Sequence, residues 1–358
     1  MDNKTTRTVA AEQVREFVSA ILRGHGVPAE DAMITADHLV KANLRGVDTH
    51  GVIRLKGYIA RIKAGGNNPR PKISVVKESS FGAVMDGGNG LGQVGGRRAM
   101  ELAIKKAGES GIGIVVLRNS NHYGMAGYYS MMPLKYDMLG LSMTNVLACM
   151  APTGGTAGRV GNNPISLALP AGEEPPVVLD MASSKSSWGR ALLCQEKGEP
   201  LPEDCFMDVN GNPTLDADAF LDGGTLLPIA EHKGYGIALG ISLLCGLLAD
   251  GPFDTELPHL YKKLDAPGGN SFLMAAAKVD TFAPIAHFKK RMDKTIAMIR
   301  ATPRAAGVSG IYLPGQIEHE TELKRRQSGI PINETLISDL QSLAEEIGLD
   351  VSDYEFLN

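Results

Sequence analysis

The sequence predicts a mixed α/β (α+β) protein in which helices from both ends of the chain flank a middle that contains a sheet. The first observation is helical periodicity before residue 64 and again near the C-terminus. The second is a middle region where short apolar runs, typical of strands, alternate with helical segments. The third is an excess of glycine, 42 in 358 residues, which suits tight turns and close backbone approach.

The N-terminal region is expected to be helical. Apolar spacing predicts helices at 10–23 and 29–45, and a third helix at 49–63. The stretch GGNNPRP at 65–71 is rich in helix breakers and ends this region.

The middle and C-terminal regions are read from apolar runs bounded by glycine, proline and polar turns. Strands are expected at 73–86, 111–117, 139–145, 164–169, 176–180 and 272–280. Helices are expected at 95–109 and 125–135, from about residue 183, and at 235–248, 283–300 and 335–347.

Composition excludes several classes of protein. The 36 Lys and Arg against 40 Asp and Glu give a net charge of −4 with no basic block, which argues against a nucleic-acid or anionic-membrane partner. Cys149, Cys194, Cys205 and Cys245 have no CxxC spacing, so neither a disulfide framework nor a metal site is expected. The N-terminus has no signal-peptide pattern, and the uncharged run at 234–249 is shorter than a membrane span. We expect a soluble, cytoplasmic protein.

The segment DTHGVIRLKGY holds the first candidate site. If Thr49 caps a helix, His50, Arg54 and Tyr58 share one face of it, and Asp48 can accept a hydrogen bond from the imidazole. An imidazole to exchange a proton and a guanidinium to bind a carboxylate suit redox chemistry on a 2-hydroxy or 2-oxo acid. The alternative is a surface helix with scattered polar residues.

A second histidine lies in RNSNHYG. His122 follows the strand predicted at 111–117, and ligands of open α/β sheets collect beyond the carboxyl ends of strands. The alternative is a turn histidine that satisfies local backbone groups. The sequence does not decide whether His50 or His122 moves the proton.

The loop GGNGLGQVGG carries a literal GxGxxG at Gly90, Gly92 and Gly95. A dinucleotide fingerprint has its first glycine at the strand end and an acid about 20 residues on. Here residues intervene between Asp86 and Gly90, and Ser110 stands near the acid position. We interpret the loop as structural, with a Rossmann dehydrogenase as the rival.

Two helix entrances are candidate phosphate sites. DMASSKSS leads from a strand into a helix, and HKGYG places Lys233 and Gly234 just before another. Free N–H groups and the positive dipole end at a helix N-terminus favour a pyrophosphate. Ordinary helix capping is the alternative.

These motifs together resemble a known family. LRGVDTHGVIRL, SNHYGMAGYY, GRVGNNPISLALP, VLDMASS, HKGYG and YLPGQ occur in the order seen in the malate/L-lactate dehydrogenase family of the second, non-Rossmann type. That family includes ureidoglycolate and sulfolactate dehydrogenases and 2,3-diketogulonate and piperideine-2-carboxylate reductases. The resemblance extends from the first helix to about residue 330.

The resemblance implies a fold, an activity and an assembly. It implies a mixed-sheet cofactor domain at 126–307 and a helical substrate and dimerisation domain from 1–125 plus 308–358. It implies hydride transfer between NAD or NADP and C2 of a small 2-oxo or 2-hydroxy acid, in a homodimer. The alternatives are reduction of a cyclic imino acid or a sugar-derived 2-oxo acid, or a cofactor-binding protein without turnover.

The resemblance also implies roles for particular residues. His50 or His122 is the acid/base, and Arg54 binds the substrate carboxylate with Thr49, Tyr58 and Asn145 nearby. The residues implied to hold the cofactor are Asp180, Met181, Ala182, Lys233, Gly234, Gly307, Val308 and Ser309.

One departure from the family pattern bears on the cofactor. Glu231 and His232 precede Lys233, where the family usually has a pair of glycines. A carboxylate there would repel a 2′-phosphate, so the choice between NAD and NADP stays open.

Overall fold

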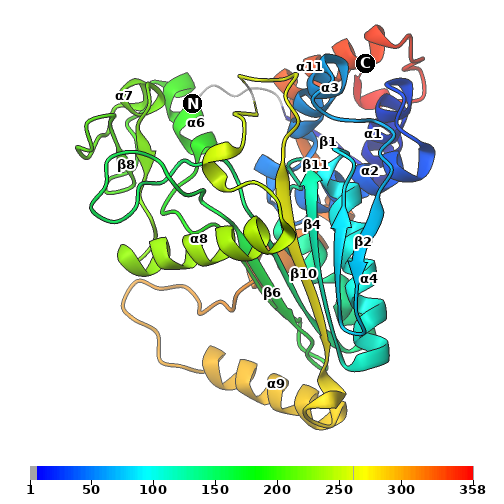
Figure 1. The fold of residues 1–358 in the computed structure, drawn as a ribbon, viewed down its shortest axis with the longest axis vertical. Helices are drawn as coiled ribbons and strands as arrows, with labels where there is room; N and C mark the ends of the chain where they lie inside the picture. Colours follow the sequence, from blue (N-terminus) through cyan, green and yellow to red (C-terminus); the bar gives the residue numbers. More distant parts are fainter. Residues whose placement is uncertain (1–5, 261, 358) are drawn as a thin grey trace.

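A single mixed sheet forms the centre of the molecule in the computed structural model, which describes residues 6–260 and 262–357 (Figure 1). It has seven strands in the order β2-β3-β4-β10-β5-β6-β7. Only the β3–β4 pair is parallel. The strands are β2 (Ser74–Glu78), β3 (Gly82–Asp86), β4 (Ile112–Ser120), β10 (Asn270–Lys278), β5 (Met138–Thr144), β6 (Ile165–Leu169) and β7 (Val177–Met181). This arrangement confirms the predicted fold class and excludes the parallel Rossmann sheet.

Both faces of the sheet are covered by helices. On one face α4 (Gly92–Ser110) packs against Val115 and Leu117 of β4. On the other face α8 (His232–Cys245) packs against Val116 and Leu273. Because successive strand residues point to opposite faces, the apolar run of β4 supplies both layers. Figure 1 shows α8 lying across its face of the sheet.

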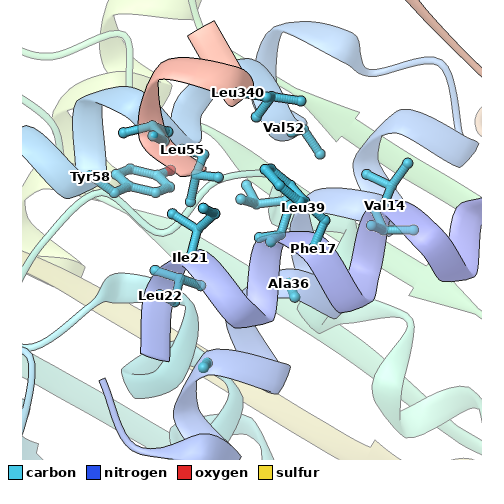
Figure 2. Packing of buried hydrophobic residues seen from close by; sticks show 14 of the residues in the cluster. Val14, Phe17, Ile21, Leu22, Ala36, Leu39, Val52, Leu55, Tyr58 and Leu340 are labelled. Atoms are coloured by element: carbon cyan, nitrogen blue, oxygen red, sulfur yellow. The ribbon is translucent and has the colours of Figure 1, made fainter. Parts of the chain in front are cut away.

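The two ends of the chain meet in a helical unit. It contains α1 (Ala11–Gly24), α2 (Ala29–Leu44), α3 (Leu55–Ala64), α11 (Glu334–Glu346) and the antiparallel pair β1 (Thr6–Val9) with β11 (Ile330–Asn333). Phe17 and Ile21 of α1 are fully buried against Leu39, Leu55 and Leu340 (Figure 2). The 3.6-residue period of α1 aligns these apolar residues into one buried stripe.

A helix that the sequence did not indicate, α10 (Gln316–Ser328), also packs on this unit. Its single buried residue is Glu322, whose carboxylate lies 2.5 Å from Lys41 Nζ and 3.3 Å from Arg45 Nη1. The helix therefore docks through charge rather than through an apolar stripe, which is why hydrophobic periodicity does not reveal it.

The predicted helix at 49–63 is partly wrong. Two short 3-10 turns, Asp48–His50 and Val52–Arg54, precede α3. Asn43 Oδ1 accepts a hydrogen bond from the Val52 N–H at 2.8 Å, and a Cβ on Gly51 would lie 2.2 Å from the same oxygen. The Asn43 side chain thus accepts the hydrogen bond that the Val52 N–H would donate to a backbone carbonyl in a continuous helix.

Two other boundaries also differ from expectation. The helix predicted from residue 183 is α6 (Trp188–Lys197), because Lys185 N–H pairs with the Leu227 carbonyl and Ser187 caps the helix. The single β-rich run at 73–86 is the hairpin of β2 and β3. The remaining helices are α5 (Ala126–Ser130), α7 (Ala217–Leu221) and α9 (Ile285–Arg300), and β8 (Phe206–Met207) pairs with β9 (Thr225–Leu226).

The division at 125/126 and 307/308 stays a prediction. Strands β2, β3 and β4 come from 1–125, and β5, β6, β7 and β10 from 126–307, yet all belong to one sheet. Among the described residues, His232–Ala249 is long and apolar enough to cross a membrane by length and composition alone, and 39% of it is buried.

Candidate active site

A cavity of about 800 Å³ opens between the helical unit and the sheet. Most of its lining residues lie in five parts of the chain: the turns around 45–54, the loop 122–127 after β4, the segment 144–149 after β5, the end of β7, and the segment 312–318 before and within α10. The others come from 162–164, 187–189, 226 and 259–260. The cavity therefore gathers motifs that are far apart in the sequence.

Both candidate histidines lie in this cavity. The rings of His50 and His122 stack with centroids 5.6 Å apart and planes 21° apart. His122 sits in the loop after β4, as predicted from its position beyond a strand end. The neighbouring Asn121 is buried and anchors that loop by donating to the Gly90 carbonyl at 2.9 Å.

The two histidines have different partners. His122 Nδ1 lies 2.8 Å from the hydroxyl of Tyr58. His50 Nδ1 lies 3.0 Å from the hydroxyl of Thr49, which also lines the cavity. Asp48, expected to bond the His50 imidazole, instead pairs with Arg325 at 2.7 Å and accepts from Asn43 at 2.6 Å.

Arg54 brings the positive charge of the site. Its guanidinium lines the cavity, and its Nε donates to the Thr49 carbonyl at 2.5 Å. This bond ties the guanidinium to the same turn that carries His50.

Both histidines are neutral at neutral pH. Burial, then Arg54 and His38, lower the pKa of His50 to about 3. Burial, then His50 and Arg54, lower the pKa of His122 well below its usual value. Desolvation disfavours the charged imidazolium, and a neighbouring cation adds to that effect.

An acid also lines the cavity. Asp180 is the last residue but one of β7 and accepts a hydrogen bond from the Gly127 N–H at 2.7 Å through Oδ2. Although accessible from the cavity, this carboxylate is surrounded by protein, and desolvation raises its pKa to about 6. Met181 and Ala182 also line the cavity.

The structure leaves several predicted site residues outside the cavity lining. Tyr58 lines a smaller neighbouring cavity of about 70 Å³ with Arg54 and His122. Asn145 is fully buried, and its side chain accepts from Ser271 N–H at 2.8 Å and donates to the Pro252 carbonyl at 3.0 Å. Also outside the lining are Lys233, Gly234, Gly307, Val308 and Ser309.

The cavity includes residues that the site prediction missed. Arg45 is only 6% exposed, lines the cavity and pairs with Glu322. Tyr312 and Pro314 line the wall next to β7, and Trp188 and His259 make an edge-to-face contact at 5.8 Å. Arg45, Tyr312 and Pro314 fall within the motifs LRGVDTHGVIRL and YLPGQ. These motifs identified the family resemblance, but no role was assigned to the three residues from the sequence.

Within residues 6–260 and 262–357, no group of three or more His, Cys, Asp or Glu side chains is placed to hold a metal ion. The four cysteines are free thiols.

Comparison with known proteins gives one consistent result. Residues 9–341 match the family model for malate/L-lactate dehydrogenase. A malate dehydrogenase of Pyrococcus horikoshii is 39% identical over 351 residues, 96% of each chain. An L-sulfolactate dehydrogenase of Methanocaldococcus jannaschii is 39% identical over 344 residues, 96% of this chain and 98% of that one. A solved sulfolactate dehydrogenase structure from that organism superposes with a TM-score of 0.90 at 38% identity, covering 97% of this chain and 99% of the other.

Proposed function

The chain belongs to the malate/L-lactate dehydrogenase family, and on that premise we propose that it is a nicotinamide-dependent oxidoreductase of small 2-hydroxy acids. The substrates named for its relatives, malate and sulfolactate, are both 2-hydroxy acids. The single observation that carries the proposal is that Arg54, His50, His122 and Asp180 all line one cavity.

The cavity residues fit a nicotinamide dinucleotide, NAD or NADP. A volume of about 800 Å³ is within the range of cofactor sites, which are mostly apolar with a few directing polar groups. Val178, Leu179 and Pro314 form an apolar wall. The carboxylate of Asp180 can accept hydrogen bonds from hydroxyl groups. Asp180, Met181 and Ala182 would hold the cofactor, which supplies or accepts the hydride when bound. Cofactor binding by Lys233, Gly234 and residues 307–309 stays a prediction from the sequence.

Arg54 is the substrate-binding residue in this proposal. A guanidinium binds a carboxylate through two parallel N–H···O bonds, which fixes orientation as well as position. The bond from its Nε to the Thr49 carbonyl holds the arginine head next to the histidines. A 2-oxo acid held in this way has its C2 oxygen near the histidine pair.

The histidine pair handles the proton. Reduction of a 2-oxo acid adds a hydride to C2 and a proton to the oxygen, and oxidation removes both. His50 or His122 exchanges that proton with the substrate oxygen. Replacement of the acting residue by asparagine should lower kcat by about 10²–10⁴-fold, whereas replacement of the other should cost much less.

The active protein is proposed to be a homodimer, as the sequence resemblance implies. Ile237, Leu243, Leu244, Leu247 and Leu248 on α8 and the turn after it are each between 44% and 57% exposed. An apolar helix face of this kind suits a contact with a second copy. Sedimentation equilibrium should give twice the mass of one chain, and a monomer at micromolar concentration would contradict this part of the proposal.

The test of function is a substrate screen with purified protein. NADH or NADPH is mixed with pyruvate, oxaloacetate, sulfopyruvate, 2,3-diketogulonate or a cyclic imino acid, and loss of nicotinamide absorbance is followed. Oxidation with a 2-oxo acid is expected. Turnover with the imino acid alone would replace the substrate class. Failure of both dinucleotides to bind, measured by melting temperature, would overturn the proposal.

A further inference from the structure

We propose that the small cavity beside Arg54 and His122 holds the substituent on C2 that completes the 2-oxo acid, and that the buried guanidinium of Arg61 selects substrates in which this substituent ends in an anionic group. The inference rests on the proposed function, in which Arg54 binds the C1 carboxylate. It narrows the substrate class to short 2-oxo acids with a second acid group attached to C3, such as oxaloacetate.

The small cavity adjoins the place where the reaction is proposed to occur. It has a volume of about 70 Å³, and Arg54, His122 and Leu260 line both this cavity and the larger one of about 800 Å³. A 2-oxo acid held by Arg54, with its C2 oxygen near the histidines, can therefore place its remaining substituent in this space. Since a water-sized group takes up roughly 30 Å³, the cavity has room for about two or three heavy atoms. A carboxylate fits there, and a longer chain does not.

Positive charge borders the small cavity. Arg54 and Arg61 both line it, and none of the described residues in its lining is acidic. Arg61 is only 3% exposed, and an arginine side chain stays charged in proteins. Burial lowers the pKa of Arg61, and Asp265, which is outside the lining, opposes this effect more weakly. An anionic substituent in the cavity is attracted by this charge, whereas a neutral one is not.

The contacts of Arg61 hold its guanidinium in place without neutralising it. Its hydrogen bonds all go to neutral oxygens, which are the side-chain amides of Asn67 and Asn121 and the backbone carbonyls of Gly66, Leu260, Lys263 and Ala266. These acceptors occupy all five N–H groups of the guanidinium and leave its net charge in place. Arg61 therefore acts on a substrate through its charge and not through a direct hydrogen bond.

The same contacts also give Arg61 a structural role. They tie the carbonyls of Lys263 and Ala266 to α3, the helix that carries Arg61. Loss of the side chain would therefore disturb the fold together with any selectivity. A useful test changes the charge and the hydrogen bonds separately.

The charge of the substituent is tested with two substrates of the same shape. Oxaloacetate and its 4-amide differ in whether the group attached to C3 is charged. We expect kcat/KM of the wild type to be about 10–100-fold higher for oxaloacetate than for the amide. 2-Oxoglutarate, which is one methylene longer, should be reduced about 10-fold less efficiently than oxaloacetate or worse. Equal efficiency with oxaloacetate and the amide would overturn the proposal.

Asn67→Asp changes the charge and keeps the hydrogen bond. The Oδ1 of Asn67 accepts from Arg61 Nε at 3.2 Å, so an aspartate of the same shape would pair with the guanidinium and cancel its charge. The preference for oxaloacetate over the amide should fall about 5-fold or more. Asn210→Asp, the same change at an exposed turn after β8, is the matched control and should keep the wild-type preference. An unchanged preference in Asn67→Asp would overturn the role of Arg61.

Arg61→Lys makes the opposite change. Lysine keeps the positive charge but has fewer donors, so the melting temperature should fall while the preference for oxaloacetate stays within about threefold of the wild-type value. A purely structural arginine would instead leave the preference unchanged in Asn67→Asp. If Arg61→Lys does not fold, Asn67→Asp decides.

Failure of this inference can be distinguished from failure of the proposed function. A wild type that reduces pyruvate or the amide as efficiently as oxaloacetate would overturn the selectivity and leave the proposed function standing. A wild type that reduces no 2-oxo acid with either dinucleotide would overturn both.

Discussion

At the scale of single residues, which side chains gather in one cavity was easier to predict than the contacts they make there. His50, His122 and Arg54 were identified because imidazole and guanidinium suit a 2-oxo acid, and all three line one cavity. The partners of these groups were not predictable, because they come from distant segments. Tyr58 bonds His122 rather than lining the main cavity, and Asp48 pairs with Arg325 rather than with His50. Local spacing carries no information on such long-range pairs.

The residue-scale prediction concerns Arg54→Lys. Lysine keeps the charge but loses the planar fork that binds a carboxylate through two hydrogen bonds. We expect KM for the 2-oxo acid to rise about 10–100-fold, corresponding to roughly 1.5–3 kcal/mol for a charged hydrogen bond. Steady-state kinetics measure this, with Lys56→Arg on the same segment as the control. A KM within twofold of the wild-type value would remove Arg54 from the substrate site.

At the scale of elements, prediction succeeded where apolar periodicity decides the structure. The strands β4, β5, β6, β7 and β10 and the helices α1, α2, α4 and α9 lie close to their predicted positions. Prediction of the elements failed where polar contacts determine the structure. The Asn43 side chain breaks the helix expected at 49–63, and α10 docks through Glu322. At the start of α4, Gly92 packs directly on the backbone that carries His122, and this close approach favours the interpretation of the GxGxxG loop as structural.

Gly92→Ala tests this close approach. A Cβ at Gly92 would lie 2.2 Å from the Asn121 carbonyl oxygen and 2.5 Å from that of His122, so the histidine loop must shift. We expect a loss of about 1–3 kcal/mol in the free energy of unfolding and a fall in kcat, with dinucleotide binding retained. Denaturant titration and calorimetric titration of the cofactor measure these effects.

The matched control lies on the same helix. A Cβ at Gly108 would meet nothing within 4 Å, so Gly108→Ala should stabilise α4 by up to about 1 kcal/mol. Abolished dinucleotide binding in Gly92→Ala, with Gly108→Ala normal, would instead favour a phosphate-binding role for the loop.

At the scale of the whole molecule, the sequence indicated helices at both chain ends and a sheet between them. It did not indicate that β10 would lie between β4 and β5, because strand order depends on long-range pairing rather than on any local pattern. The same folding buries His38 of α2 completely beneath the site, where its Nε2 lies 3.3 Å from the Met125 carbonyl. The other ring nitrogen is buried without a hydrogen-bond partner among the described residues.

The burial of His38 predicts that the free energy of unfolding falls in acid. Burial lowers the pKa of His38 to about 4 from 6.5, against a weaker opposing effect of the Met125 carbonyl. Below pH 6.5 the unfolded chain takes up a proton that the folded protein does not, so stability is lost as the pH falls from about 6.5 to about 4. The loss from His38 alone is on the order of 3 kcal/mol. Unfolding free energies measured across this range should show a shallower slope for His38→Met than for the wild type. Equal slopes would contradict the account.

The central claim, hydride transfer at C2 of a 2-hydroxy or 2-oxo acid, is tested most directly by isotope transfer. Reduced dinucleotide carrying deuterium at C4 is incubated with the enzyme and the 2-oxo acid that gives the fastest turnover, and the product is analysed by mass spectrometry and proton NMR. The account predicts a 2-hydroxy acid with one deuterium on C2, formed at wild-type rate by Gln327→Glu, which changes an exposed residue of α10, and far more slowly by one of the two variants His122→Asn and His50→Asn, the one that removes the acting residue. A product without deuterium at C2, or no product from any 2-oxo acid, would contradict it.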